Sequence, residues 1–311
     1  ADVARAKPVE FWDVIIPYSR MRDPEFGWLA ETYTYEDASP QANMPYDRPE
    51  DSLRAGFDAY YGQYHIFHEW SSAKEFHDYV IDNLNMSYRI ERGKSLIGSF
   101  ATHDDISPMN HGGEVYCNLT SGLQATLPML NPYYVDGFQS GDTYEYSYRG
   151  KEVEQTATDS NIMTAHQGKL DIFNLSRKPG GNNPKIGEFM TQTLEFRDKY
   201  AEIIKRGSYL VLDKEGDDKD QVIAFARHRH GRTLLVVANK NVNKGISCKV
   251  KVPTMKANQK LENLLPSYGE KSKFQASQGE LSVDLGAGRV HVFEIDTPYI
   301  ETYNRKVYKQ H

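Results

Sequence analysis

The sequence predicts an α/β region with a parallel sheet, followed by a smaller antiparallel β-sandwich. In residues 1–205, short apolar segments alternate with segments whose apolar residues recur at helical spacing, which is typical of parallel strands joined by crossover helices. From about residue 206, short runs rich in β-branched and aromatic residues follow one another, separated by turn residues. We therefore expect a domain boundary between residues 1–205 and 206–311.

Helices and buried strands are both expected in the first region. The first helix carries Phe11 and Trp12 among its apolar residues and ends at Asp23-Pro24, because proline breaks the helical pattern. The second helix opens with a serine cap at Ser71. The expected helices are 9–22, 71–88, 113–128 and 183–204, and the expected strands are 26–31, 95–102 and 129–137.

The second region is predicted to consist of strands alone. Turn clusters such as KEGDD, HGR, NVNKG and GAG separate its apolar runs, and no helical pattern lies between them. The lysine-rich end at 304–311 is expected to be a solvated tail. The predicted strands are 208–213, 222–229, 233–240, 247–253, 280–285 and 289–296.

Composition excludes several classes of function. The net charge of −6 leaves no basic face for nucleic acid, and no apolar run approaches the roughly 20 residues of a membrane helix. Cys117 and Cys248 lie far apart, which indicates two free thiols. The 21 Tyr, 13 Phe and 3 Trp suit stacking on sugar rings and equally suit half-buried packing. A metal site is not expected, because the histidines are scattered, including His65, His68, His77 and those at 228–230.

Three acidic residues stand where a strand meets a loop. Asp2 lies in ADVARAKPVEFW, Glu31 ends FGWLAE, and Asp104 follows SLIGSFAT. In a (β/α)8 barrel the reactive residues occupy the carboxyl ends of the strands, so the three side chains would project into one mouth. Each has an ordinary alternative: an exposed acid for Asp2, a cap or loop acid for Glu31, and a polar turn for His103-Asp104.

The same stretches resemble, in order, motifs of the α-amylase superfamily of retaining glycoside hydrolases. ADVARAKPVEFW is similar to its strand-four motif, FGWLAETY to its strand-five motif, and SFATHDD to its strand-seven motif. SLRAGFDAYYG falls between the last two motifs, and SGLQATLPMLNPYYVDG resembles the passage from helix seven to strand eight. The resemblance spans most of residues 1–296 and implies the C-terminal half of a (β/α)8 TIM barrel, strands four to eight, followed by a small antiparallel β-sandwich.

The resemblance also implies roles for individual residues. Asp2 would be the nucleophile, Glu31 the general acid/base, and Asp104 the acid that stabilises the transition state. Arg5 and His103 would contact the sugar. Candidates for the walls of sugar subsites are Trp28, Tyr33, Tyr133 and Tyr134.

The implied chemistry has physical requirements that this pattern can meet. Retaining glycoside hydrolysis needs an ionised nucleophile and a protonated acid about 5–5.5 Å apart. Neighbouring strands lie about 4.8 Å apart, which suits Asp2 and Glu31 on adjacent strands. The charge of Asp104 would help to keep Glu31 protonated. No cofactor is required, although relatives often carry structural calcium in a region that this chain lacks.

The resemblance places the first three barrel strands, and most of the fourth, before Ala1. A half barrel would expose sheet edges and a large apolar face to water. We therefore expect the N-terminal barrel half to exist as a separate chain or as a preceding segment of the same gene product.

Three functions are compatible with the sequence. The leading hypothesis is a retaining glycosidase that hydrolyses α-glucosidic bonds in starch-like substrates or malto-oligosaccharides. Thr102 stands where the family usually has Asn. A Thr at this position is similar to the sucrose-acting and glucan-transferring branches of the family, so a transglycosylase is the second hypothesis. A non-catalytic carbohydrate-binding or assembly subunit is the third.

Overall fold

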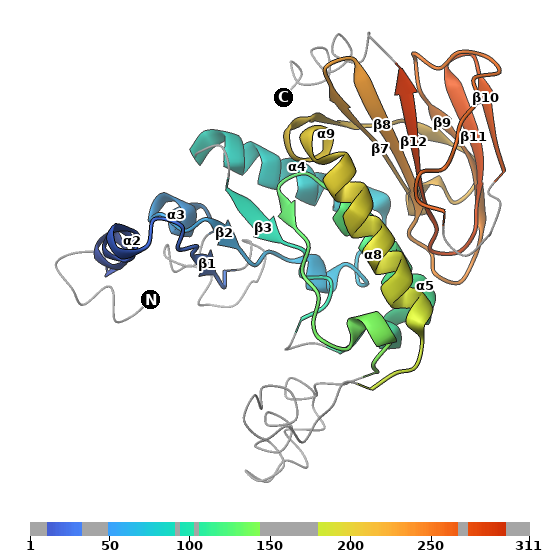
Figure 1. The fold of residues 1–311 in the computed structure, drawn as a ribbon. Coiled ribbons are helices and arrows are strands. Elements are labelled where there is room, and N and C mark those ends of the chain that lie inside the picture. Colours follow the sequence, from blue (N-terminus) through green and yellow to red (C-terminus); the bar gives the residue numbers. More distant parts are fainter. Residues whose placement is uncertain are drawn as a thin grey trace.

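The computed structural model describes residues 11–32, 49–90, 94–102, 106–143, 180–266 and 273–296. Its helices are α2 (Phe11–Arg22), α3 (Pro49–Arg54), α4 (Ala73–Ile90), α5 (Pro108–Thr126), α8 (Pro184–Lys199) and α9 (Ala201–Arg206). Short 3-10 turns are η2 (Tyr64–Ile66), η3 (Phe138–Ser140) and η4 (Lys219–Gln221). Parallel strands come first in the chain and antiparallel strands follow (Figure 1).

The parallel sheet has the strand order β1-β2-β3-β4. Its strands are β1 (Leu29–Ala30), β2 (Ala59–Tyr60), β3 (Ser95–Ile97) and β4 (Leu130–Asn131). Three of them lie inside the predicted segments and are shorter than expected. Strand β2 was not predicted, because two strand residues in DAYYG produce no periodicity.

The helices of this region form where capping and apolar spacing predict them. In α4, Phe76 and Val80 are buried one turn apart on the face that packs inward. The Ser107 side chain caps α5 by accepting a hydrogen bond from the backbone of Met109. A kink with non-helical backbone at Gly112 and Gly113 divides α5, which explains why the apolar pattern began only at residue 113.

Two antiparallel sheets form the second part of the chain. One has the order β12-β8-β7-β5 and the other β10-β11-β9-β6. One core of buried residues contains side chains from both sheets, so the pair is a sandwich, as predicted. The strands are β5 (Ser208–Val211), β6 (Lys214–Glu215), β7 (Val222–Arg229), β8 (Arg232–Asn239), β9 (Ile246–Lys251), β10 (Lys273–Ser277), β11 (Glu280–Leu285) and β12 (Val290–Asp296). Strands β6 and β10 were not predicted.

The first of these sheets is buried on both faces. Along β7, Val222 and Ala224 belong to the core between the two sheets, whereas Ile223 and Phe225 belong to a core shared with the helices. The two sets alternate because successive side chains of a strand point to opposite faces. The helices contribute Phe76 and Leu123 to the shared core, and α8 runs between the parallel strands and the sandwich (Figure 1). The boundary at residue 205 stays a prediction.

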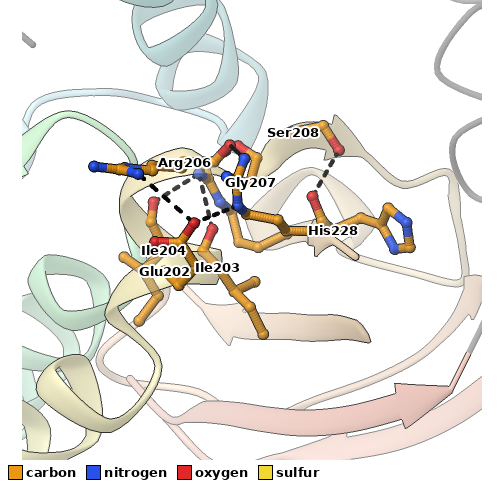
Figure 2. A network of polar contacts seen from close by, with 9 residues as sticks. Glu202, Ile203, Ile204, Arg206, Gly207, Ser208 and His228 are labelled. Carbon is orange, nitrogen blue, oxygen red and sulfur yellow. Dashed lines mark hydrogen bonds and ion pairs between the residues drawn. The ribbon is translucent and has the colours of Figure 1, made fainter. Parts of the chain in front are cut away.

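A buried arginine joins helix α9 to this sheet. The Nη2 atom of Arg227 on β7 donates hydrogen bonds to the carbonyl oxygens of Ile204, at 2.6 Å, and Gly207, at 2.7 Å. These carbonyls lie at the carboxyl end of α9, where a helix has no internal donors left for them (Figure 2). The half-buried Arg229 pairs with Glu202 on the same helix at 2.7 Å.

His77 joins a second helix, α4, to the same sheet. Its Nδ1 atom shares a hydrogen bond of 2.7 Å with the Tyr209 hydroxyl, which joins α4 to β5. Burial, and secondarily the charge of Lys214, lowers the pKa of His77 to about 3. The imidazole is therefore neutral in the folded protein at neutral pH.

We predict that His77 makes the protein sensitive to acid. Between about pH 6.5 and 3 the unfolded chain protonates this group and the folded chain does not, so the free energy of unfolding falls as the pH falls. The slope from one such group is at most about 1.4 kcal/mol per pH unit. Urea denaturation at pH 7, 5.5 and 4.5 should show a smaller pH slope for His77→Gln.

His230→Asn is the control, because His230 is an exposed turn residue with positive φ, a conformation that asparagine tolerates. An unchanged slope in His77→Gln, or an equal reduction in both variants, would show that another group causes the sensitivity.

Candidate active site

The carboxyl ends of the four parallel strands lie along one edge of the sheet. Register pairs Ala30 with Tyr60, Tyr60 with Leu96, and Ile97 with Asn131. Because the strands are parallel, the residues that follow them lie at the same edge. In a sheet of this type, that edge is where catalytic side chains are found.

Glu31 directly follows β1 at this edge. Ala30 is 5% exposed and Glu31 is exposed, which is the alternation expected of neighbouring residues in an extended chain. The backbone is held on both sides of Glu31: the Ala30 oxygen accepts from the Tyr61 amide at 3.0 Å, and the Thr32 oxygen accepts from the Gly62 amide at 3.2 Å. The carboxyl group is thus attached to a fixed backbone and open to solvent.

The segment after β3 is anchored before it reaches the predicted His103-Asp104 pair. The Ser99 hydroxyl is fully buried and donates to the Tyr61 oxygen at 3.1 Å, which joins the ends of β2 and β3. Phe100 stacks on Tyr64 with ring centroids 4.5 Å apart. Thr102, which ends the described segment, is fully buried.

Most of the predicted site lies outside the described residues. All of the predicted roles stay predictions. The predicted site residues that the structure does describe are Glu31, Trp28, Tyr133 and Tyr134. Those outside are Asp2, Arg5, Tyr33, His103 and Asp104.

Trp28 precedes β1 and packs against helix α2. Its ring lies 5.9 Å from that of Trp12 and 6.0 Å from that of Phe57, and its indole nitrogen donates to the Ser19 hydroxyl at 2.8 Å. Its backbone amide donates to Asp58 at 2.8 Å. These contacts lie at the amino end of β1, whereas Glu31 is at the carboxyl end. The predicted contact between Trp28 and a sugar stays a prediction.

Two helix residues that were not among the predicted site residues contact the strand ends. The Tyr79 hydroxyl on α4 accepts from the Gln63 amide at 2.7 Å, and Gln124 Oε1 on α5 accepts from the Tyr133 amide at 2.8 Å. The sequence signal for these contacts was the glycines Gly62 and Gly98, which let the helix side chains approach the backbone closely. The glycines alone do not show which helix residue faces them.

The described residues give little support for a metal site or for a reactive cysteine. They contain no group of three or more His, Cys, Asp or Glu side chains that could hold a metal ion. Cys117 and Cys248 are buried free thiols, and burial raises the pKa of Cys248 to about 11. None of the described helices has the length and apolar character needed to cross a membrane.

Solved structures share this fold, although no protein-family model and no curated protein sequence matches the chain. A maltogenic alpha-amylase from Thermotoga neapolitana matches 93% of this chain and 59% of its own, with a TM-score of 0.60 at 16% identity. An Anoxybacillus alpha-amylase matches 92% of this chain and 56% of its own, with a TM-score of 0.61 at 13% identity. The Nostoc punctiforme debranching enzyme matches 93% and 56%, with a TM-score of 0.58 at 18% identity.

These matches confirm the resemblance to α-amylase-family enzymes at the level of the fold. Over more than nine-tenths of its length, the chain has a fold found in these enzymes. It spans little more than half of the length of each of them.

We predict that the buried hydrogen bond of Ser99 stabilises the carboxyl edge of the parallel sheet, where the candidate site lies. Ser99→Ala removes the donor and leaves a buried carbonyl with one partner fewer, which should lower the free energy of unfolding by about 1–2 kcal/mol. Ser95→Ala, on the strand that precedes Ser99, is the matched control. The Ser95 hydroxyl takes part in an exposed bond to Asn131, and its loss should lower the free energy of unfolding by less than about 0.5 kcal/mol. Equal midpoints of urea unfolding for the two variants would contradict this.

Proposed function

We propose that the chain is the C-terminal half of the (β/α)8 barrel, with the β-sandwich, of a retaining glycosidase that cleaves α-glucosidic bonds in starch-like substrates. The observation that carries the proposal is the position of Glu31 at the carboxyl end of β1, on the edge that the segment leading to His103-Asp104 also reaches. The order of the sequence motifs and the shared fold support the same assignment.

In the proposed mechanism, hydrolysis proceeds by double displacement. Asp2 attacks the anomeric carbon while Glu31 gives its proton to the glycosidic oxygen, so the bond to the leaving sugar breaks as the bond to Asp2 forms. Asp104 offsets the positive charge that develops on the sugar ring. Glu31, now ionised, then takes a proton from the water that hydrolyses the glycosyl ester and regenerates Asp2.

The proton on Glu31 requires a specific electrostatic environment. Glu31 is exposed in the described part of the chain. To act as an acid it needs negative charge nearby and walls that exclude water. In the proposed site the negative charge comes from Asp2 and Asp104, and one wall comes from the N-terminal half of the barrel.

An exposed apolar surface supports the proposal that an N-terminal half covers this chain. On α2, Phe11, Val14, Tyr18 and Met21 are 45%, 54%, 55% and 81% exposed, and their spacing of three and four residues places them on one side of the helix. Leu29 on β1 is 49% exposed. Apolar patches of this kind mark surfaces that another element covers.

The edge of the sheet points to the same occupant. In the sheet formed by the described residues, β1 is an edge strand that pairs with β2 alone. Helix α2 lies beside β1 and far from the sandwich (Figure 1). We propose that further parallel strands and helices, supplied upstream in the same polypeptide or by a second one, pair with β1 and pack on α2.

Glu31→Gln tests the proposed reaction. In the complete protein, comprising this chain and the N-terminal half, kcat on maltoheptaose should fall by about 10²–10⁴-fold. The reason is that an amide cannot give a proton to the leaving group, and Glu31 is the acid proposed to do so. Glu25→Gln, an exposed acid shortly before β1, should have no effect. Unchanged turnover in Glu31→Gln would show that the acid is wrongly assigned.

Product analysis in the same assay separates the other candidate functions. Release of glucose and short maltodextrins supports hydrolysis, whereas oligosaccharides longer than the substrate indicate transfer to a sugar. Binding of maltoheptaose without turnover by the complete protein would favour the non-catalytic subunit.

The double variant Tyr18→Asp with Met21→Asp tests the proposed surface for the N-terminal half. With that half produced as a separate polypeptide, the dissociation constant should rise at least about tenfold, which corresponds to about 1.4 kcal/mol. Tyr88→Asp is the control, because Tyr88 is 67% exposed on a different helix, α4. If Tyr88→Asp weakens binding equally, or the double variant binds normally, the occupant of the α2 surface is not the N-terminal half.

A further inference from the structure

Two side chains from different helices reach up to the carboxyl edge of the parallel sheet. Each accepts a hydrogen bond from the backbone amide of a residue just past a strand, and each touches a glycine at a strand end. Tyr79 does this from α4 after β2, and Gln124 does it from α5 after β3 and β4. We call this pair the edge brace.

Gln124 joins the ends of two strands. Its side chain is fully buried, and Oε1 accepts from the Tyr133 amide at 2.8 Å, two residues past β4. The same oxygen lies so close to Gly98, the residue after β3, that a Cβ atom on Gly98 would be 1.9 Å from it. Gly98 in turn donates its amide to the Asn131 oxygen at 2.8 Å. One side chain therefore fixes the separation of the two strand ends.

Tyr79 holds the end of β2 in the same way. Its hydroxyl accepts from the Gln63 amide at 2.7 Å and would lie 2.6 Å from a Cβ atom on Gly62. Gly62 has φ of +75°, which disfavours any side chain there. Its amide bonds to the Thr32 oxygen, next to Glu31. The brace therefore reaches the backbone on which the proposed acid is carried.

A contribution to the stability of the fold does not by itself explain why a glutamine occupies this buried position. Its Nε2 atom is buried and has no hydrogen-bond partner among the described residues. A buried donor without a partner is unfavourable, and a methionine of similar length would avoid it. What methionine would lose is the acceptor for the Tyr133 amide.

We propose that Gln124 and Tyr79 are positioning residues for the proposed glycosidase: they act through backbone amides to hold the ends of β2, β3 and β4 in the geometry that the reaction requires. This rests on the proposed function. Displacement of a reacting group by about 1 Å can reduce the rate about 10²-fold, so a small shift at the strand ends would affect kcat more than substrate binding.

Gln124→Met in the complete protein is the main test. Amide hydrogen exchange at Tyr133 should become at least about tenfold faster, because the amide loses its acceptor. With maltoheptaose, kcat should fall about 10–10²-fold while KM changes less than about twofold. Gln124→Glu keeps an oxygen acceptor of the same reach and should restore most of kcat.

Tyr79→Phe removes a single hydroxyl group and serves as a second variant if Gln124→Met does not fold. The expected result is the same pattern, with faster exchange at Gln63 in place of Tyr133. Tyr88→Phe, at an exposed position on the same helix, is the matched control and should change neither exchange nor kcat.

The exchange and kinetic measurements separate failure of the brace from failure of the proposed function. Unchanged exchange at Tyr133 in Gln124→Met would overturn the brace, whatever the enzyme does. Faster exchange with unchanged kcat would overturn the positioning role. If the complete protein has no glycosidase activity, the proposed function and the positioning role both fail, and exchange still decides whether the brace exists.

Discussion

The buried guanidinium of Arg197 holds the parallel sheet to the helices that cover it. From α8, its Nη1 atom donates to the carbonyl oxygens of Gln124, at 3.0 Å, Ala125, at 3.2 Å, and Leu127, at 3.2 Å. Its Nη2 atom donates to the Leu130 oxygen. One side chain thus satisfies the carbonyls that the end of α5 leaves without donors, and it also holds the first residue of β4. Burial lowers its pKa to about 10, so it is still charged at neutral pH.

Arg197 and Arg227 solve the same problem in two places. Each is buried at 5% exposure or less, and each places a cation against carbonyls at the carboxyl end of a helix, where the helix dipole is negative. Arg197 does so where the end of α5 meets the start of β4, and Arg227 does so at the contact between α9 and the sandwich. A buried charge is tolerated at both places because several oxygens surround it. The position of Gln124, and with it the edge brace, depends on the first of these contacts.

The sandwich is part of the same packed body as the parallel sheet. Because β7 and β8 send alternate residues into two different cores, the sheet that contains them cannot be removed without exposing the apolar face of the helices. His77 and Tyr209 add a polar link within that contact. A loss of stability in the sandwich would therefore be expected to loosen α4 and α5, which carry the edge brace.

Local patterns were sufficient to predict the parts of the fold in which local sequence decides the structure. The limits of β7 and β11 match the predicted runs 222–229 and 280–285, because turn residues flank alternating or β-branched runs there. Strand β2 was missed because its two residues owe their conformation to pairing with β1 and β3.

Only part of the candidate site could be predicted from the sequence. Glu31 could be proposed from its motif, and the structure puts it at the expected edge of the sheet. The contacts of Gln124 and Tyr79 could not, because they depend on how each helix is rotated against the strands. Several predicted site residues, Asp2 and Asp104 among them, lie outside the described residues, and their roles stay predictions.

The proposed reaction and the proposed assembly meet at the same strand. Glu31 follows β1, and β1 also has the edge that the N-terminal half would cover. If Asp2 lies on the strand that pairs with this edge, the separation of nucleophile and acid is set by inter-strand spacing, about 4.8 Å, across that contact. Docking would then bring the two carboxyl groups together and supply the charge that keeps Glu31 protonated. Errors in docking would consequently affect the chemical step even where sugar binding is preserved.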